Sequence, residues 1–261
     1  MRSLSTGATG MMAQQLNVEV ISNNIANMST TAFKRQRAEF QDLLYQNLRR
    51  PGSTSSDANT IVPSGIQIGV GVRAAGVYRI HEQGNLTTTG NSYDIAINGK
   101  GFYQVTLPSG ETAYTRAGSF QVDGQGQLVT VDGYQLQPGI AVPQGALSVS
   151  IDATGIVEAR LAGQAQPQQL GQIQLATFIN EAGLEATGDN LFLETPASGQ
   201  PTVGNPNAAG FGTLRQGYLE TSNVNPVQEI TNLITAQRAY EMNSKVITAS
   251  DEMLQAASRL R

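Results

Sequence analysis

Cysteine is absent from the 261-residue chain, and histidine occurs only once, at His81. The absence of cysteine excludes disulfides, thiolate metal sites and cysteine nucleophiles. A single histidine excludes any metal site built on two histidines. Tryptophan is also absent, and aromatic residues make up only 6% of the chain. We therefore expect no catalytic residues, no cofactor and no metal.

Charge is scarce as well. Charged residues make up 14% of the chain, the net charge is −4, and no basic patch favours nucleic-acid binding. No apolar run approaches the ~20 residues of a membrane-spanning helix, so we expect no membrane insertion. The N-terminus, which begins with residues 1–4, also has no apolar segment of roughly 7–15 residues, which a cleaved secretory signal would require. This composition predicts a cytoplasmic protein, or one exported without signal cleavage.

The C-terminal segment contains no glycine or proline after Pro226, which predicts a helix from Pro226 to Arg261. Asn225 suits the N-cap, Pro226 the first helical position, and Gln228 the third position of a capping box. Apolar residues recur at steps of three and four, in two neighbouring stripes. Such a wide apolar arc exceeds the needs of a two-stranded seam, so we expect other chains to cover part of it. The stripes are Ile230, Leu233, Tyr240, Ile247 and Leu254, and Val246, Ala249, Met253, Ala256 and Leu260.

The N-terminal segment is predicted to be helical from Thr6 to about Asn27, because its apolar residues follow the same spacing. Residues 27–31 are poor in helix formers and predict the end of this helix. We expect the two terminal helices to pair as a coiled-coil-like element and to contact neighbouring subunits. The predicted subunit interface comprises Leu4, Met11, Leu16, Val18, Ile21, Ile25, Ile230, Leu233, Ile234, Tyr240, Ile247 and Leu254.

The segment after the first helix is ambiguous. Residues 33–50 suit a second helix or an extended arm, residues 52–65 have linker composition, and residues 66–80 alternate weakly, as in extended chain. A linker that stays in water gains no stability from apolar side chains, yet several occur in this region. We therefore expect an arm that buries Ile61, Ile66, Ile68 and Val70 against neighbouring subunits.

From Gly84 to about Leu219 the pattern is one of short strands and turns. Asp132-Gly133 predicts a β-hairpin. Asp123-Gly124-Gln125-Gly126 lacks the repeated acidic ligands of a calcium loop and predicts a turn. His81 beside Glu82 is interpreted as a surface pair. The fold class is α+β, with helical segments 1–30 and 220–261, an arm 31–80 and an inserted β-rich domain 81–219.

The segment from Ser22 to Arg35 resembles the N-terminal signature of the bacterial flagellar rod and hook family. Residues 83–86, 94–102, 114–120, 216–225 and 237–241 are similar to later landmarks of that family, so the resemblance covers essentially the whole chain. Taken by themselves, Asn23, Asn24 and Asn27 suggest local capping at the end of the helix. Phe33 suggests a core anchor or a partner contact, and Lys34 suggests a solvated face. The motif residues are Asn23, Asn24, Ala26, Asn27, Phe33 and Lys34.

This resemblance implies a non-enzymatic structural subunit that forms a hollow, rigid helical polymer transmitting torque from motor to hook. The chain length and the region 42–80 look most like the distal rod members. The implied partners are further copies of itself, proximal rod proteins, the hook protein and the ring proteins around the rod. The implied location is the periplasm-spanning rod of the basal body, reached by type III export. Alternatives are a proximal rod or hook subunit and, from another class, a β-rich wall-binding enzyme.

Overall fold

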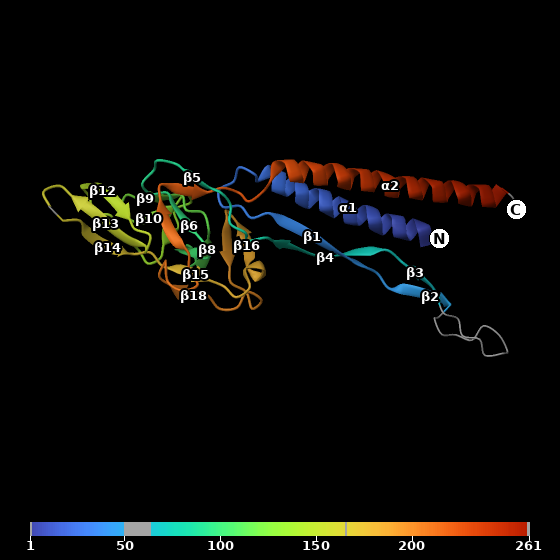
Figure 1. The fold of residues 1–261 in the computed structure, drawn as a ribbon, viewed down its shortest axis with the longest axis horizontal. Helices are drawn as coiled ribbons and strands as arrows, with labels where there is room; N and C mark the ends of the chain where they lie inside the picture. The colour runs from blue at the N-terminus through green and yellow to red at the C-terminus, as the bar shows by residue number, and fades with distance from the viewer. Residues whose placement is uncertain (1, 50–63, 165, 260–261) are drawn as a thin grey trace. The chain divides into compact units, whose positions relative to one another are not determined.

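A computed structural model describes residues 2–49, 64–164 and 166–259 (Figure 1). The chain forms two compact units, which we call the helical unit and the β unit. The helical unit comprises Met1–Ala26, Gln36–Arg79 and Asn225–Arg261, and the β unit comprises Asn27–Arg35 and Ile80–Val224. The chain therefore passes between the units four times, after residues 26, 35, 79 and 224.

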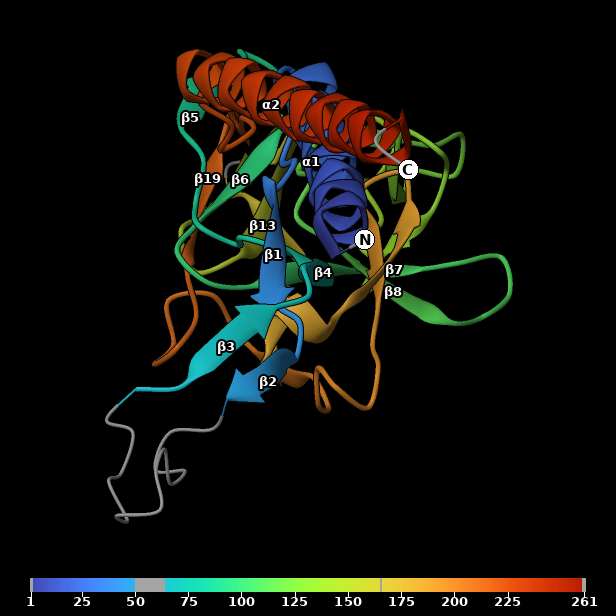
Figure 2. The ribbon, with the colours of Figure 1, turned by 90° about the vertical axis from the view of Figure 1, so that its right-hand side faces the viewer.

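The helical unit contains α1 (Arg2–Ala26) and α2 (Pro226–Arg259), which contact each other. Both views show the two helices running side by side (Figures 1 and 2). Two glycines of α1 lie directly against α2. A Cβ atom on Gly7 would lie 2.9 Å from Ile247 Cγ1, and one on Gly10 would lie 2.8 Å from Asn243 Nδ2. These glycines therefore permit an approach that larger residues would prevent.

The start of α2 confirms the predicted N-cap. Asn225 Oδ1 accepts hydrogen bonds from the backbone amides of Val227 at 3.1 Å and Gln228 at 3.3 Å. The Gln228 side chain does not complete the expected capping box. It is directed along the helix instead, where its Nε2 donates to Asn232 Oδ1 at 3.0 Å.

We expect Gly7→Ala to destabilise the helical unit, although alanine favours an isolated helix by about 1 kcal/mol over glycine. The added Cβ would press on Ile247 Cγ1 at 2.9 Å, and overpacking of this kind costs about 1–3 kcal/mol. Thermal unfolding followed by far-ultraviolet circular dichroism measures the effect. In an Ile247→Ala background the cost should shrink, because the overlapping atom is gone. A stabilising Gly7→Ala in the wild-type background would contradict the close approach.

The helical unit also contains two antiparallel ladders. Strand β1 (Gln36–Asp42) pairs with β4 (Val72–Arg79), and β2 (Tyr45–Arg49) pairs with β3 (Ile66–Gly69). Strands β1 and β4 both contact α1. The alternative of a second helix over residues 33–50 is therefore wrong in its described part. Pairing with a distant strand outweighs a local sequence that tolerates helix.

The residues expected on the arm have different surroundings. Ile66 and Ile68 are exposed on β3, and Val70 is half-buried beside it. Ile61 lies outside the described residues. The ladders confirm extended chain, whereas the expectation that this segment crosses to neighbouring subunits remains a prediction.

The β unit is built around a sheet of nine strands. Its main path runs β16-β17-β8-β7-β11-β10-β9, and β15 pairs with both β7 and β18. Strands β12, β13 and β14 form a second sheet, while β19 pairs with β6 and β20 with β5. The bounds are β5 Leu86–Thr88, β6 Ile95–Asn98, β7 Phe102–Thr106, β8 Thr112–Thr115, β9 Phe120–Val122, β10 Leu128–Thr130, β11 Gln135–Leu136, β12 Ala146–Ile151, β13 Ile156–Leu161, β14 Gln168–Gln172, β15 Leu175–Thr177, β16 Glu185–Gly188, β17 Leu191–Leu193, β18 Thr202–Gly204, β19 Thr213–Gln216 and β20 Tyr218–Glu220, with a 3-10 turn at Glu181–Gly183.

The core of the β unit is apolar and includes a buried tyrosine. Tyr103 lies edge-on to Phe120, with ring centroids 5.0 Å apart, and its hydroxyl donates to the Ile95 carbonyl at 2.7 Å. A second apolar cluster contains Phe102 and Phe192. His81 packs edge-on against these two rings at 5.8 and 5.9 Å. The interpretation of His81 as half of a surface pair is therefore wrong, because aromatic packing holds its ring half-buried.

Two turns predicted from the sequence are confirmed. Strands β10 and β11 form an antiparallel pair around Asp132-Gly133, and Gly133 adopts a φ of 86° that favours glycine. At the other turn, Asp123 Oδ1 accepts hydrogen bonds from the amides of Gln125 and Gln127 at 2.8 and 2.7 Å. This carboxylate thus stabilises its own loop.

Candidate functional site: a buried ion network in the β unit

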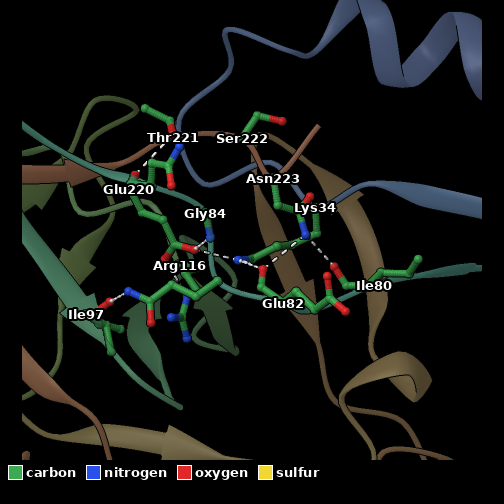
Figure 3. Close-up of polar contacts among 12 residues, drawn as sticks. Lys34, Ile80, Glu82, Gly84, Ile97, Arg116, Glu220, Thr221, Ser222 and Asn223 are labelled. Carbon is green, nitrogen blue, oxygen red and sulfur yellow. Dashed lines mark hydrogen bonds and ion pairs between the residues drawn. The ribbon is translucent and has the colours of Figure 1, made fainter. Parts of the chain in front are cut away.

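Three charged side chains from distant parts of the sequence meet inside the β unit. Glu220 ends strand β20, Arg116 directly follows β8, and Lys34 belongs to the segment Asn27–Arg35 (Figure 3). Lys34 Nζ lies 2.6 Å from Glu220 Oε1, and Arg116 Nε lies 2.7 Å from Glu220 Oε2. The exposed fractions are 2% for Lys34, 6% for Arg116 and 2% for Glu220. One carboxylate therefore bridges two buried cations.

Backbone groups provide further hydrogen bonds to these charges. The Gly84 amide donates to Glu220 Oε1 at 2.8 Å, and Lys34 Nζ donates to the Glu82 carbonyl at 2.8 Å. Arg116 donates through Nη1 to the Gly101 carbonyl at 2.9 Å and through Nη2 to the Gly99 carbonyl at 2.6 Å. Hydrogen bonding of this kind offsets the desolvation cost of burying charges.

Neighbouring hydrogen bonds tie the same segments together. The Ala32 amide donates to the Glu220 carbonyl at 2.8 Å, and Ala32 is buried at a φ of 57°. Asn223 Oδ1 accepts from the Arg35 amide at 2.7 Å, and its Nδ2 donates to the carbonyls of Ile80 and Glu82 at 2.9 and 3.0 Å (Figure 3). The network thus fastens together the segments around residues 32–35, 80–84 and 220–223, each of which leads into a crossing of the chain.

Burial and neighbouring charges have opposite effects on the pKa values of Glu220 and Lys34. Burial disfavours the charged form of Glu220, but the charges of Arg116 and Lys34 outweigh burial and hold its pKa below the ordinary value of 4.5. Burial lowers the pKa of Lys34 below 10.5, although Glu220 offsets part of that effect. The two cations therefore favour the charged form of the Glu220 carboxylate, whereas burial makes the Lys34 ammonium easier to deprotonate than a free lysine.

Glu220 should make the stability of the β unit depend on pH, with a loss of stability in acid. Because its pKa is lower in the folded protein than in the unfolded chain, the unfolded chain binds more protons in that window. Its contribution is fully present above pH 4.5 and is lost as the pH falls through the folded-state pKa. Urea unfolding of wild type and Glu220→Gln at several pH values tests this. The difference between the two should shrink below pH 4.5; a constant difference would contradict ionisation of Glu220.

Lys34 corrects one expectation. Its interpretation as part of a solvated face is wrong, because its ammonium group is buried against Glu220, 186 residues away. A pairing at that separation leaves no local pattern. Glu220, Arg116, Gly84 and Asn223 were not singled out as site residues, yet all four lie within the stretches that resemble the family landmarks.

The other motif residues lie in varied surroundings. Asn24 is buried in the helical unit, where its side chain exchanges two 2.8 Å hydrogen bonds with the Gln36 backbone and donates to Glu229 Oε2 at 3.2 Å. Local capping is therefore wrong for Asn24, whose partners are 12 and 205 residues away. Asn27 Oδ1 accepts from Thr30 at 3.1 Å, which fits a local turn. Phe33 is half-buried, whereas Asn23 and Ala26 are exposed.

The predicted subunit-interface residues do not gather into one site. Ile21 is buried within the subunit. The exposed members are Ile230, Ile234 and Tyr240. The partly buried members are Leu4, Met11, Leu16, Val18, Ile25, Leu233, Ile247 and Leu254. Their contact with neighbouring subunits remains a prediction.

Two features of the described residues bear on other functions. No three acidic, histidine or cysteine side chains of the described ranges group closely enough to hold a metal ion. None of the helices in this part of the chain has the length and apolarity needed to span a membrane.

Comparison with known families places each charge of the network in a different matched region. Residues 4–34 match the family described as flagella basal body rod protein, and this stretch ends at Lys34. Residues 96–159, which contain Arg116, match the flagellar hook protein FlgE/F/G D1 domain. Residues 215–260, which contain Glu220, match the flagellar basal body rod FlgEFG protein C-terminal family.

Individual relatives match over the full length. The chain is 64% identical to the flagellar basal-body rod protein FlgG of Caulobacter vibrioides, over 100% of both chains. It is 54% identical to FlgG of Agrobacterium fabrum, over 99% of both chains. Identity to FlgG of Bacillus subtilis is 40%, over 100% of this chain and 99% of that one.

Proposed function

Because this chain belongs to the family of flagellar basal-body rod proteins FlgG, we propose that it polymerises into the distal rod and transmits torque from motor to hook. The observation that carries the mechanical part is the buried network of Lys34, Arg116 and Glu220. The four crossings of the chain join the two units covalently, so a load that passes between the units acts on them. Within the β unit, the network anchors three of the segments that lead into these crossings.

Polymerisation requires apolar surfaces that are exposed to water in the single subunit. Ile230, Ile234 and Tyr240 are exposed on α2. On the β2–β3 ladder, Leu48, Ile66 and Ile68 are exposed as well. A two-stranded ladder is at best marginally stable alone in water, and neighbouring subunits would stabilise it by covering these side chains. The coiled-coil-like helix pair, the arm and the four-part division of the chain are parts of this proposal.

The proposal also covers the surroundings of the polymer. Open helical filaments arise when one surface of a subunit binds a different surface of the next. Proximal rod proteins would adjoin one end of such a filament and the hook protein the other, with ring proteins around the shaft. The chain would act by binding and stiffness alone, without catalysing a reaction.

The proposed function can be tested in a relative. We expect the chain to restore swimming to a Caulobacter vibrioides strain that lacks its own FlgG, because the two proteins are 64% identical over their full lengths. Soft-agar motility gives the first measurement. Electron microscopy of purified basal bodies gives the second, and should show rods of normal length with hooks attached.

Purified protein provides an independent test. At rising concentration, wild type should form unbranched tubes of uniform diameter in negative-stain images. Protein that remains monomeric at all concentrations and also fails to restore rods in cells would overturn the proposed function.

A further inference from the structure

The sequence contains a single asparagine–glycine pair, Asn98-Gly99, at the end of strand β6. Both residues are exposed to solvent. An asparagine followed by glycine is especially prone to spontaneous deamidation, because glycine has no Cβ atom to hinder the attack of its backbone nitrogen on the asparagine side chain. The pair therefore combines a chemically labile sequence with access to water.

The fold requires glycine at position 99. Gly99 has a φ of 114°, in the region that favours glycine, and a Cβ atom placed there would lie 2.9 Å from the Cα atom of Gly212. Any other residue would be strained by this backbone conformation and would press on the neighbouring chain. The labile pair is thus a consequence of the close approach between these two glycines.

The side chain of Gln83 holds both reacting groups of the pair. Its Oε1 accepts a hydrogen bond from the Gly99 amide at 2.9 Å, and its Nε2 donates to the Ile97 carbonyl at 3.2 Å and to Asn98 Oδ1 at 3.4 Å. A donor on one side and acceptors on the other fix the orientation of this side-chain amide. The Gly99 nitrogen must leave its hydrogen bond to Gln83 before it can attack Asn98 Cγ.

We propose that Asn98 is a site of self-modification to isoaspartate, that Gln83 restrains the reaction in the folded protein, and that the product loosens the buried ion network. This inference goes beyond the proposed function and does not depend on polymerisation. Gln83 is a positioning residue, because it holds the Gly99 nitrogen and takes no part in the bonds that form and break.

The reaction needs only water as a co-reactant. The Gly99 nitrogen forms a bond to Asn98 Cγ, the bond between Cγ and Nδ2 breaks, and ammonia leaves with the proton that the Gly99 amide gives up. Water then opens the resulting cyclic imide. Attack at the main-chain carbonyl carbon gives isoaspartate, whose backbone runs through Cβ and Cγ and is one atom longer. Attack at Cγ gives ordinary aspartate.

The longer backbone would act on the ion network through Gly99. The Gly99 carbonyl accepts a 2.6 Å hydrogen bond from Arg116 Nη2, and Arg116 is paired with Glu220. An extra backbone atom between residues 98 and 99 displaces this carbonyl, so the guanidinium loses a partner while it stays buried. A buried donor without a partner destabilises the folded state.

Removal of the Gln83 hydrogen bonds tests the restraint. Gln83→Leu keeps the approximate size of the side chain but neither accepts nor donates. In native buffer at mildly alkaline pH, isoaspartate at residue 98 should form at least roughly fivefold faster in this variant than in wild type, a factor that the net contribution of one hydrogen bond provides. In urea, where neither protein has the restraint, the two rates should be equal. Enzymatic methylation quantifies isoaspartate, and mass spectrometry of peptides locates it.

Gln135→Leu is the matched control, because Gln135 is an exposed glutamine of the same unit whose side chain donates to Gln127 instead. This variant should form isoaspartate at the wild-type rate. Circular dichroism confirms that each variant is folded. Hydrogen exchange gives a second measurement that needs no variant: in wild type the Gly99 amide should exchange more slowly than an unprotected amide, despite its exposure.

Aged wild type measures the effect on the network. Its isoaspartate form, isolated by chromatography, should unfold at a lower urea concentration than Asn98→Asp, which carries the same new charge on a backbone of normal length. Equal unfolding midpoints would overturn the effect on the network.

Three other results would overturn the remaining parts of the inference. Absence of isoaspartate at residue 98 in urea would show that the pair is not labile. Equal rates for Gln83→Leu and wild type in native buffer, or a Gly99 amide that exchanges without protection, would show that Gln83 does not restrain the reaction.

Discussion

Glu220→Ala is expected to lower the free energy of unfolding of the β unit by about 3–5 kcal/mol. Glu220 neutralises both Lys34 and Arg116, at 2.6 and 2.7 Å, and also accepts the Gly84 amide. Its removal leaves two cations buried together without an anion. Removing one partner of a buried pair is far more costly than the pair's net contribution, because the remaining charge is not rehydrated. Urea unfolding followed by tyrosine fluorescence gives the measurement.

The matched control is Glu185→Ala, which removes an exposed carboxylate from strand β16 of the same unit. Surface substitutions of this kind usually change stability by less than about 0.5 kcal/mol. Lys34→Met should have a smaller effect than Glu220→Ala, because the Arg116–Glu220 pair survives it. If Glu220→Ala and the control destabilise equally, Glu220 does not hold the network together.

Gly84→Ala is the second substitution with a large expected effect. A Cβ atom at Gly84 would overlap the backbone carbonyl oxygen of Thr221, which cannot rotate away as a side chain can. The segment would have to shift, and the Gly84 amide would lose its 2.8 Å hydrogen bond to Glu220. We expect a cost of about 3 kcal/mol, at the upper end of the range for overpacking. Thermal unfolding of the β unit measures it.

Gly124→Ala supplies the control for this prediction. Gly124 is in the same unit, nothing lies within 4 Å of a Cβ placed there, and neither glycine has a positive φ. Any difference between the two variants therefore reports the overlap with Thr221 and not the loss of backbone freedom. A Gly84→Ala protein as stable as Gly124→Ala would show that residues 84 and 221 do not approach closely.

Local patterns in the sequence predicted much of the fold. Apolar spacing predicted both helices, and the Asn225 cap formed as expected because its partners are two and three residues away. The hairpin at Asp132-Gly133 formed because glycine supplies the positive φ its turn requires. Each of these features depends on neighbours in the chain, so the sequence displays it directly.

The ion network could not be predicted in the same way. Lys34 and Glu220 are 186 residues apart, and Arg116 and Glu220 are 104 apart. A lysine in a polar segment has the same local appearance whether it is solvated or buried, because only the fold brings its partner. The choice between a helix and an extended arm over residues 33–50 stayed open for a related reason: β1 exists through its pairing with β4.

The contact between Asn24 and Glu229 has a consequence for the order of folding. These residues are 205 positions apart, so the base of the helix pair cannot form until nearly the whole chain is present. The β unit, by contrast, includes hairpins such as β10–β11 that close over a few residues. Contacts between residues far apart in the sequence form more slowly than contacts between near neighbours, because closing the longer loop costs more chain entropy. A truncated chain that ends before Pro226 would therefore fold no helix pair, and incomplete subunits would be excluded from any assembly that needs both helices.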